Sequence, residues 1–505
     1  MTQRGNLTRA TAPATKPSQR LRDRQLAKTR PLAERRLSDF LPLGPAEQLL
    51  LDCCRAGEMA QVAEKRPEAP DATNRIRASF LRFLLLGGDE QAPVHERGVR
   101  ISGYWVEGRL DLGGCAVPFG ATLVHSHFAG SLFAHDARLS GPLSLEGSCL
   151  SRGMNADRVQ VNGGMFLRGG FLAKHEVRLL GAQIGGNLDC QGGQFEVKDG
   201  DALSAERAVV KGVLFLRGLK AAVRLDLSHA EVGVLADEVA AWAPGSVLDG
   251  FRYGALGGDA PTSGAERLAW LHKQPEEDLG ANFRPQPWRQ LQRVLHEMGH
   301  HEDAKQIGIA FQDRLRAIGR IGQSPPTTSP RVARVRRVFA EGAHFCFGKL
   351  ALYGFRPTRL LAWMAGVWLV CGVLFWLLAL PPFSALAPSD PLVFQNPAYE
   401  TCLPDRSPTP GNWFLCAPLR GEYATFSPFA FSLDILLPLV DLGQEKYWGA
   451  FVPTPRPGVG EELFLNWSSG HVARLLIWFE TLFGWVCSLL LVAIVSGLAR
   501  RSEEG

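Results

Sequence analysis

The sequence lacks the short motifs that mark most nucleotide, metal and redox sites. It has no P-loop and no Gly-x-Gly-x-x-Gly after a strand-like stretch, which excludes the two commonest phosphate-binding loops. Its ten cysteines include no Cys-x-x-Cys pair and none of the Cys/His spacings typical of zinc sites. We therefore expect no cofactor, and buried, reduced cysteine is the default interpretation of most of these thiols.

The basic N-terminal tail, residues 1–38, lacks both aromatic residues and an apolar run. Without an apolar h-region it is not a signal peptide. Ten Lys or Arg between Met1 and Arg36 stand against only Asp23 and Glu34. No aromatic side chain is available to stack on bases, so we expect a disordered tail and no nucleic acid partner, with contact to anionic lipid as the alternative.

Two long apolar runs occupy the last third of the chain. Leu360–Leu380 carries no charged residue, and Leu475–Leu498 carries only Glu480, for which a snorkelling or hydrogen-bonded role is as open as a functional one. Each run exceeds the roughly 20 apolar residues that a helix needs to cross a bilayer. The run 429–437 between them suits a shorter, re-entrant or interfacial segment. Residues 360–505 are therefore predicted to form a two-span membrane domain in contact with the lipid bilayer.

Basic residues gather at one end of both runs. The intervening loop, residues 381–470, instead carries nine Asp or Glu against four Lys or Arg. The positive-inside rule places both termini in the cytoplasm and this loop outside. Cys402 and Cys416 bracket a Pro-rich stretch of the loop, where an oxidising compartment allows a disulfide between them. The flanking basic residues are Arg331, Arg334, Arg336, Arg337, Arg356, Arg359, Arg500 and Arg501.

A repeat of apolar-x-Gly-x-Leu-x-apolar fills residues 99–255. Its copies are separated by 22, 11, 22, 23, 26 and 22 residues, and they start at Val106, Phe128, Leu139, Val161, Ile184, Val210 and Val232. Alternation within a copy indicates a strand, and a fixed period near 20 indicates a stacked solenoid in which each coil contributes a short parallel strand. The alternative, a sandwich of hairpins, would need paired Asn-Gly or Asp-Gly turns between successive strands, whereas these dipeptides occur only at residues 162–163, 199–200 and 249–250. We predict a parallel β-helix.

Helical patterns flank the repeats. A helix from Pro45 and a second over 74–86, which ends at Gly87-Gly88, make residues 39–98 a helical cap for the solenoid. Residues 256–322 are predicted to form a helical hairpin. Residues 323–359 are interpreted as a linker and basic juxtamembrane segment. The fold class is therefore mixed: a capped β-solenoid followed by an α-helical membrane domain with a re-entrant segment.

One string matches the zinc-peptidase pattern His-Glu-x-x-His. It consists of His296, Glu297 and His300, which would supply two metal ligands and a general base. Asp303 and Gln306 fill the positions where a longer metalloprotease motif has Gly and His. Gly299 within the string is typical of a helix end, so we expect no zinc and no change on removing His296.

The segment 427–444 gives the membrane domain the order of a pore domain: span, outer loop, short helix, turn and span. Its notable residues are Ser432, Asp434, Pro438, Asp441, Gly443 and Gln444. This order resembles the two-span subunits of tetrameric cation channels, whose pore helix opens with an aromatic-Ser-aliphatic triplet like 431–433. The filter position keeps one glycine, so the resemblance implies an acidic ring of Asp441 in place of a carbonyl ladder. The alternative is an interfacial helix that covers a two-helix anchor.

The whole chain also resembles bacterial β-helix membrane proteins with pentapeptide-like repeats, often labelled membrane-associated oxidoreductases. The resemblance lies in the repeat, in Gly354-Phe-Arg-Pro357 before the first span, and in Leu436-Leu-Pro-Leu-Val-Asp-Leu442. It implies a location in the inner membrane. No residue supports the redox label.

Three functions remain open at this stage. The first is a membrane-anchored scaffold or sensor with an unknown cytoplasmic partner for the solenoid. The second is a cation-channel subunit that forms a homo-oligomer, a tetramer by the resemblance, with the solenoid as its assembly or gating domain. The third is an oxidoreductase or a zinc-dependent enzyme. Because no catalytic constellation is visible, we lean away from an enzyme.

Overall fold

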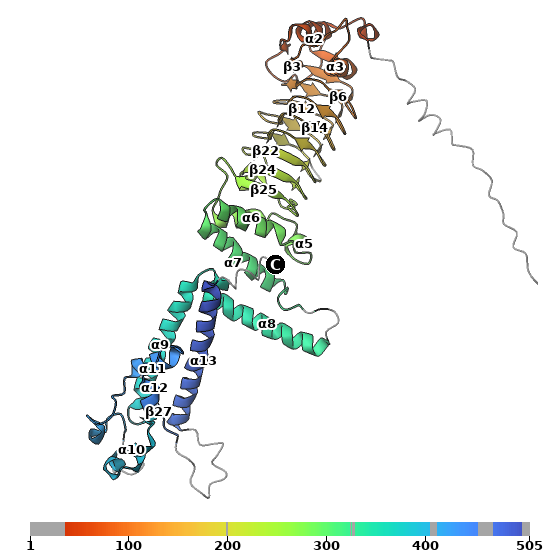
Figure 1. The fold of residues 1–505 in the computed structure, drawn as a ribbon. Helices are drawn as coiled ribbons and strands as arrows, with labels where there is room; N and C mark the ends of the chain where they lie inside the picture. Colours follow the sequence, from red (N-terminus) through yellow and green to blue (C-terminus); the bar gives the residue numbers. More distant parts are fainter. Residues whose placement is uncertain are drawn as a thin grey trace, which may run out of the picture. The chain divides into compact units, whose positions relative to one another are not determined.

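The computed structural model describes residues 36–197, 200–323, 325, 329–403, 412–452 and 468–496. The predicted disordered tail at residues 1–38 lies almost wholly outside this range. The chain divides into two compact units, Met1–Phe311 and Gln312–Gly505. The first unit holds the stacked strands and the second holds two long apolar helices (Figure 1).

The first unit is built on a parallel β-solenoid of about seven turns, which confirms the predicted fold class. Each coil passes through four short strands, and strands of successive coils pair in parallel. The first ladder is β1 (Ala60–Gln61), β3 (Val99–Ser102), β7 (Ala121–Val124), β11 (Leu143–Ser144), β15 (Met165–Phe166), β19 (Leu188–Asp189) and β22 (Val209–Leu216). The second is β2 (Arg75–Arg77), β4 (Trp105–Glu107), β8 (His127–Phe128), β12 (Cys149–Leu150), β16 (Leu172–Ala173) and β20 (Gln194–Phe195).

Two further ladders close the coils. The third is β5 (Leu110–Asp111), β9 (Leu132–Phe133), β13 (Met154–Asn155), β17 (Val177–Arg178), β21 (Leu203–Ser204) and β23 (Leu225–Asp226). The fourth is β6 (Ala116–Val117), β10 (Arg138–Leu139), β14 (Gln160–Val161) and β18 (Gln183–Ile184), which joins β22 and continues into β24 (Glu231–Asp237) and β25 (Arg252–Leu256). The sequence predicted one strand per coil, whereas the structure has four.

The ladders explain the irregular 11-residue step in the repeat. Val106 pairs with Phe128 in the second ladder, whereas Leu139 pairs with Val161 in the fourth. The step from 128 to 139 is therefore half a coil, from one face of the solenoid to another. Apolar residues of the template, such as Leu216 at 1 % exposure, point inward and stack on the coils above and below.

The N-terminal end is covered by η1 (Leu37–Phe40), α2 (Pro45–Ala56) and α3 (Ala78–Leu85). Residues 75–77, expected to be helical, instead form β2, and the ladders already begin at Ala60 rather than at residue 99. Arg77 links the cap to the strands by donating to both carboxylate oxygens of Glu47, at 2.8 and 2.6 Å. Burial raises the pKa of Glu47, but the Arg77 hydrogen bonds outweigh it and hold the pKa below its usual value.

The C-terminal end of the solenoid is closed by η2 (Val239–Ala241), α4 (Gly264–Leu271), α5 (Glu276–Leu279), α6 (Gln286–Glu297) and α7 (His301–Ala317). The predicted helical hairpin corresponds to α6 and α7. A buried ion pair joins α4 to the solenoid: Arg267 Nη2 and Nη1 donate to Asp237 Oδ1 and Oδ2 at 2.7 and 3.0 Å. Trp242 Nε1 donates to the same carboxylate at 2.8 Å, and both charged side chains are fully buried.

The second unit contains α9 (Pro357–Ala379) and α13 (Ser469–Val495), which are long and apolar enough to cross a membrane. Most of their side chains are not buried, unlike those of a soluble core helix. The shorter elements between them are β26 (Leu386–Pro388), α10 (Pro391–Gln395), η4 (Pro397–Cys402), η5 (Ala417–Leu419), α11 (Pro428–Leu436), α12 (Gln444–Tyr447) and β27 (Trp448–Ala450). Before α9 lie α8 (Pro330–Ala351) and η3 (Leu352–Gly354), in the region 323–359 that was interpreted from the sequence as a linker and basic juxtamembrane segment.

Candidate functional site

The short helix α11 packs between the two apolar helices. Two glycines make this close approach feasible, because a side chain would collide there. A Cβ at Gly484 of α13 would lie 2.0 Å from the carbonyl oxygen of Leu436, and one at Gly372 of α9 would lie 2.5 Å from the Phe429 ring. The predicted short segment is thus a helix held on both sides by the spans (Figure 1).

Ser432, one of the predicted residues, connects α11 to both spans. Its Oγ lies 3.0 Å from the carbonyl oxygen of Trp368 and 2.5 Å from Oε1 of Glu480. A carbonyl oxygen only accepts, and a hydroxyl has one proton. Both contacts are hydrogen bonds at the same time only when Glu480 is protonated and donates to Ser432 Oγ. Glu480 is fully buried, so the hydrogen-bonded alternative for it holds and the snorkelling one does not.

Asp434 fixes the chain that follows α11. Its Oδ1 accepts from the amide of Leu442 at 2.6 Å, and its Oδ2 accepts from the amide of Glu445 at 2.8 Å. Gln444 is anchored in turn, since its Oε1 accepts from the amide of Ser427 at 3.0 Å. The chain therefore descends through α11, turns, and returns beside the start of the same helix.

We call Leu437–Gly443 the return limb. Pro438 follows the end of α11, and Gly443 at the other end has φ +75°, a conformation suited to glycine. Leu439 is 86 % exposed, and Val440 and Leu442 are exposed as well. No hydrogen bond from the described part of the chain reaches the carbonyl oxygens of Pro438, Leu439 or Val440.

Asp441 lies exposed on the return limb and is already paired. Its carboxylate accepts from the amide of Gly443 at 2.9 Å and forms an ion pair with Lys446. The sequence reasoning did not consider Lys446. An acidic ring built from Asp441 would thus carry one compensating cation for each carboxylate.

The segment between α9 and α13 is cross-linked. Cys402 and Cys416 form a disulfide with their Cα atoms 5.5 Å apart, whereas the other cysteines are free. Asn412 caps the end of α9, because its Nδ2 donates to the carbonyl oxygen of Ala379 at 2.8 Å. The Asn412 contact therefore holds this cross-linked segment against the end of α9.

The His-Glu-x-x-His string is divided by a helix end. His296 and Glu297 are the last residues of α6, Gly299 has φ +88°, and His300 precedes α7. The motif requires both histidines to lie on one helix, and here they do not. Within the described ranges, no group of three or more His, Cys, Asp or Glu side chains is placed to hold a metal ion.

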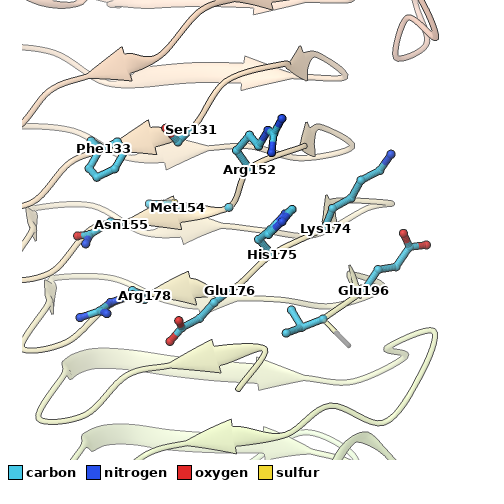
Figure 2. Close-up of a pocket in the computed structure, with 12 residues that line it drawn as sticks. Ser131, Phe133, Arg152, Met154, Asn155, Lys174, His175, Glu176, Arg178 and Glu196 are labelled. Atoms are coloured by element: carbon cyan, nitrogen blue, oxygen red, sulfur yellow. The ribbon is translucent and has the colours of Figure 1, made fainter. Parts of the chain in front are cut away.

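The solenoid carries a shallow surface hollow of about 700 Å³ over the β9, β13 and β17 strands. Arg152, Lys174 and Glu196 lie along one corner of successive coils, while Asn155 and Arg178 lie at the strands (Figure 2). The side chains fan out along the surface and their charges are mixed. Arg178 is occupied by Asp157 at 2.9 Å. This arrangement contains no nucleophile paired with a base.

No family model matches this chain, and neither a curated protein nor a solved structure matches it significantly. The second unit, in which α11 and the return limb gather the buried polar groups, is therefore the strongest candidate for a functional site.

Proposed function

We propose that this chain is a membrane-anchored β-solenoid protein whose two-span unit assembles with copies of itself into a cation-conducting pore. The solenoid then serves as the assembly or gating domain. In this arrangement α11 is the pore helix, and the return limb lines the conduction path.

The return limb is the observation that carries this proposal. Leu436 contacts Gly484, which lies 15 residues beyond Ser469, roughly 22 Å along a helix of about 40 Å. The turn after α11 therefore falls near the middle of the spans. Backbone groups without hydrogen bonds are tolerated at that depth only where protein buries them or water reaches them. Because the carbonyls of Pro438 and Leu439 have no partner in the described chain, a water-filled path shared between copies satisfies this requirement.

Self-assembly follows from the exposed apolar surface of the return limb. A single copy leaves Leu439, Val440 and Leu442 of the limb exposed, and one chain cannot enclose a path. A closed ring of identical subunits both encloses the path and covers these side chains, and a pore of this layout needs about four copies.

In the orientation we propose, the solenoid lies in the cytoplasm. The segment between α9 and α13 lies on the other side of the inner membrane. Basic residues at one end of both spans support it, as does the disulfide in the acidic loop between them, since disulfides persist in oxidising compartments.

A second candidate is a membrane-anchored scaffold or sensor, and the Asp441–Lys446 ion pair favours it. If each carboxylate is neutralised by its own lysine, the limb attracts cations less strongly. In that case α11 would serve to brace the two spans.

Reconstituting the full chain in planar bilayers separates the two candidates. For a pore, we expect an oligomer in detergent and a cation current that falls severalfold with Asp441→Asn. Lys446→Gln should raise cation selectivity, because it frees the carboxylate. The matched control is Glu231→Gln, the same loss of charge on the exposed surface of the solenoid. A monomeric, electrically silent wild-type protein would refute the pore.

A further inference from the structure

The helix α8 leaves its apolar side exposed, whereas a helix at the surface of a water-soluble protein buries that side. Its apolar side chains Val332, Val335, Val338 and Phe339 are 58, 70, 65 and 79 % exposed. These residues recur at intervals of three and four, so they form one continuous stripe along the helix. We call these four residues the α8 stripe.

The opposite side of α8 is the one that its own chain covers. His344 Nε2 lies 3.1 Å from Oε1 of Gln312 in α7. Gly322 packs so closely that a Cβ there would lie 2.7 Å from Cβ of Ala340. The residues 312–322 therefore occupy the polar side, and the stripe is left without a protein partner in the described chain.

The end of α8 is fixed beside the ends of the two spans. Only Leu352–Arg356 separate α8 from α9, and the left-handed residues Leu352 and Tyr353 turn the chain between them. Gly354 in this turn lies near both Ile494 of α13 and Phe347 of α8. Because α13 ends and α9 begins here, the C-terminal end of α8 lies at the membrane boundary if α9 and α13 span the membrane.

Positive charge lies along α8 close to the stripe. Arg331, Arg334 and Arg336 are exposed, and no carboxylate of the described residues lies within ion-pair distance of them. Arg337 is different, because it pairs with Glu341 at 2.7 Å. An apolar stripe bordered by exposed arginines is typical of helices that lie in a membrane surface containing anionic lipid.

We infer that α8 lies in the plane of the membrane surface at the end where α9 begins, with the α8 stripe in the acyl boundary and its arginines among anionic headgroups. This inference rests on α9 and α13 spanning the membrane and is independent of whether the protein conducts ions. A second copy of the chain is the less favoured occupant, because three unpaired arginines complement an anionic surface.

The depth of the stripe can be measured by spin labelling of the full chain in nanodiscs that contain phosphatidylglycerol. Labels are placed with Val335→Cys and Phe339→Cys, and with Glu231→Cys on the exposed surface of the solenoid as the water-accessible control. The accessible native thiols Cys53, Cys115 and Cys346 are replaced by serine. We expect the stripe labels to be severalfold more accessible to oxygen than to a water-soluble nickel chelate, and the control label to show the reverse.

Each other outcome overturns the inference. Stripe labels open to nickel would mean that water covers the face, and labels shielded from both reagents would mean that protein covers it. A label from Val370→Cys, on the exposed side of α9, keeps this result separate from the spanning proposal. If that label too is open to nickel, the spanning helices are wrong; if it is not, only the inference about α8 fails.

The role of the arginines is tested with Arg331→Gln, Arg334→Gln and Arg336→Gln combined. Each arginine near an anionic surface contributes roughly a fivefold preference for the bound state. The triple variant should therefore lose far more of the immersed signal with phosphatidylglycerol than with phosphatidylcholine alone. An equal response in the two lipids would refute the assignment to anionic headgroups.

Discussion

The two units of this protein bury carboxyl groups in different ways. At the end of the solenoid, Asp237 receives hydrogen bonds from Arg267 and Trp242, and both members of the ion pair are out of water. In the second unit, Glu480 is equally buried, but among the described residues only Ser432 forms a hydrogen bond with it, and its Oε2 has no hydrogen-bond partner. One site is complete within the chain and the other is not.

The two units differ in whether they provide the buried carboxyl group with hydrogen-bond and ion-pair partners from their own residues. A buried ion pair is tolerated when its hydrogen bonds are satisfied, which makes the Asp237 site a structural joint. A lone buried carboxyl requires a proton, or else a partner from outside the chain. The stability of the second unit therefore depends on the protonation of Glu480 or on an added partner, which the Asp237 site does not need.

The largest effect is expected where the complete site is broken. Arg267→Ala leaves Asp237 buried without its cation, which typically costs about 3–5 kcal/mol in the free energy of unfolding. Denaturant unfolding followed by tryptophan fluorescence reports it, since Trp242 contacts the pair. The matched control is Arg158→Ala, which removes a similar two-bond pair with Asp136 that lies in water and should change stability little. Equal losses in both variants would remove the distinction between the two sites.

The second-largest loss of stability is expected on removal of the disulfide. The second unit is held by this covalent link, whereas the solenoid is held by hydrogen-bonded ladders. Closing a loop of 14 residues stabilises by about 3 kcal/mol in the chain-entropy model. Cys402→Ser combined with Cys416→Ser should lower the melting temperature by several degrees. Alkylation of unfolded, unreduced protein should modify eight of the ten cysteines. Modification of all ten would show that the link is absent.

The smallest effect is expected at the incomplete site. Glu480→Gln keeps a donor that can reach Ser432 Oγ, so the melting temperature in detergent should stay nearly unchanged. Ser432→Ala removes the bridge between α11 and both spans and should cost about 1–2 kcal/mol. If Glu480→Gln destabilises as much as Ser432→Ala, the protonated form of Glu480 is not the one that binds Ser432.

Periodicity explains what the sequence could predict. The repeat indicated the solenoid, the apolar runs indicated α9 and α13, and the short run between them indicated α11. Each of these signals lies within one local stretch of residues. The buried partners were missed, because Arg267 follows Asp237 by 30 residues and Glu480 follows Ser432 by 48. The basic composition of residues 331–337 hid the apolar stripe of α8, which becomes visible only when the helix shows which residues share a side.

The spacing between paired strands of successive coils also bears on how this solenoid can change in length. Ladder partners are 22 residues apart at Leu143 and Met165 but 26 apart at Val177 and Leu203, and both pairs remain in parallel register. Extra residues therefore leave the coil at its corners and do not disturb the strands. Gain or loss of a whole coil would instead move everything beyond it by about 4.8 Å, the spacing of paired strands. The length of the solenoid would thus vary in fixed steps while its cross-section stays the same.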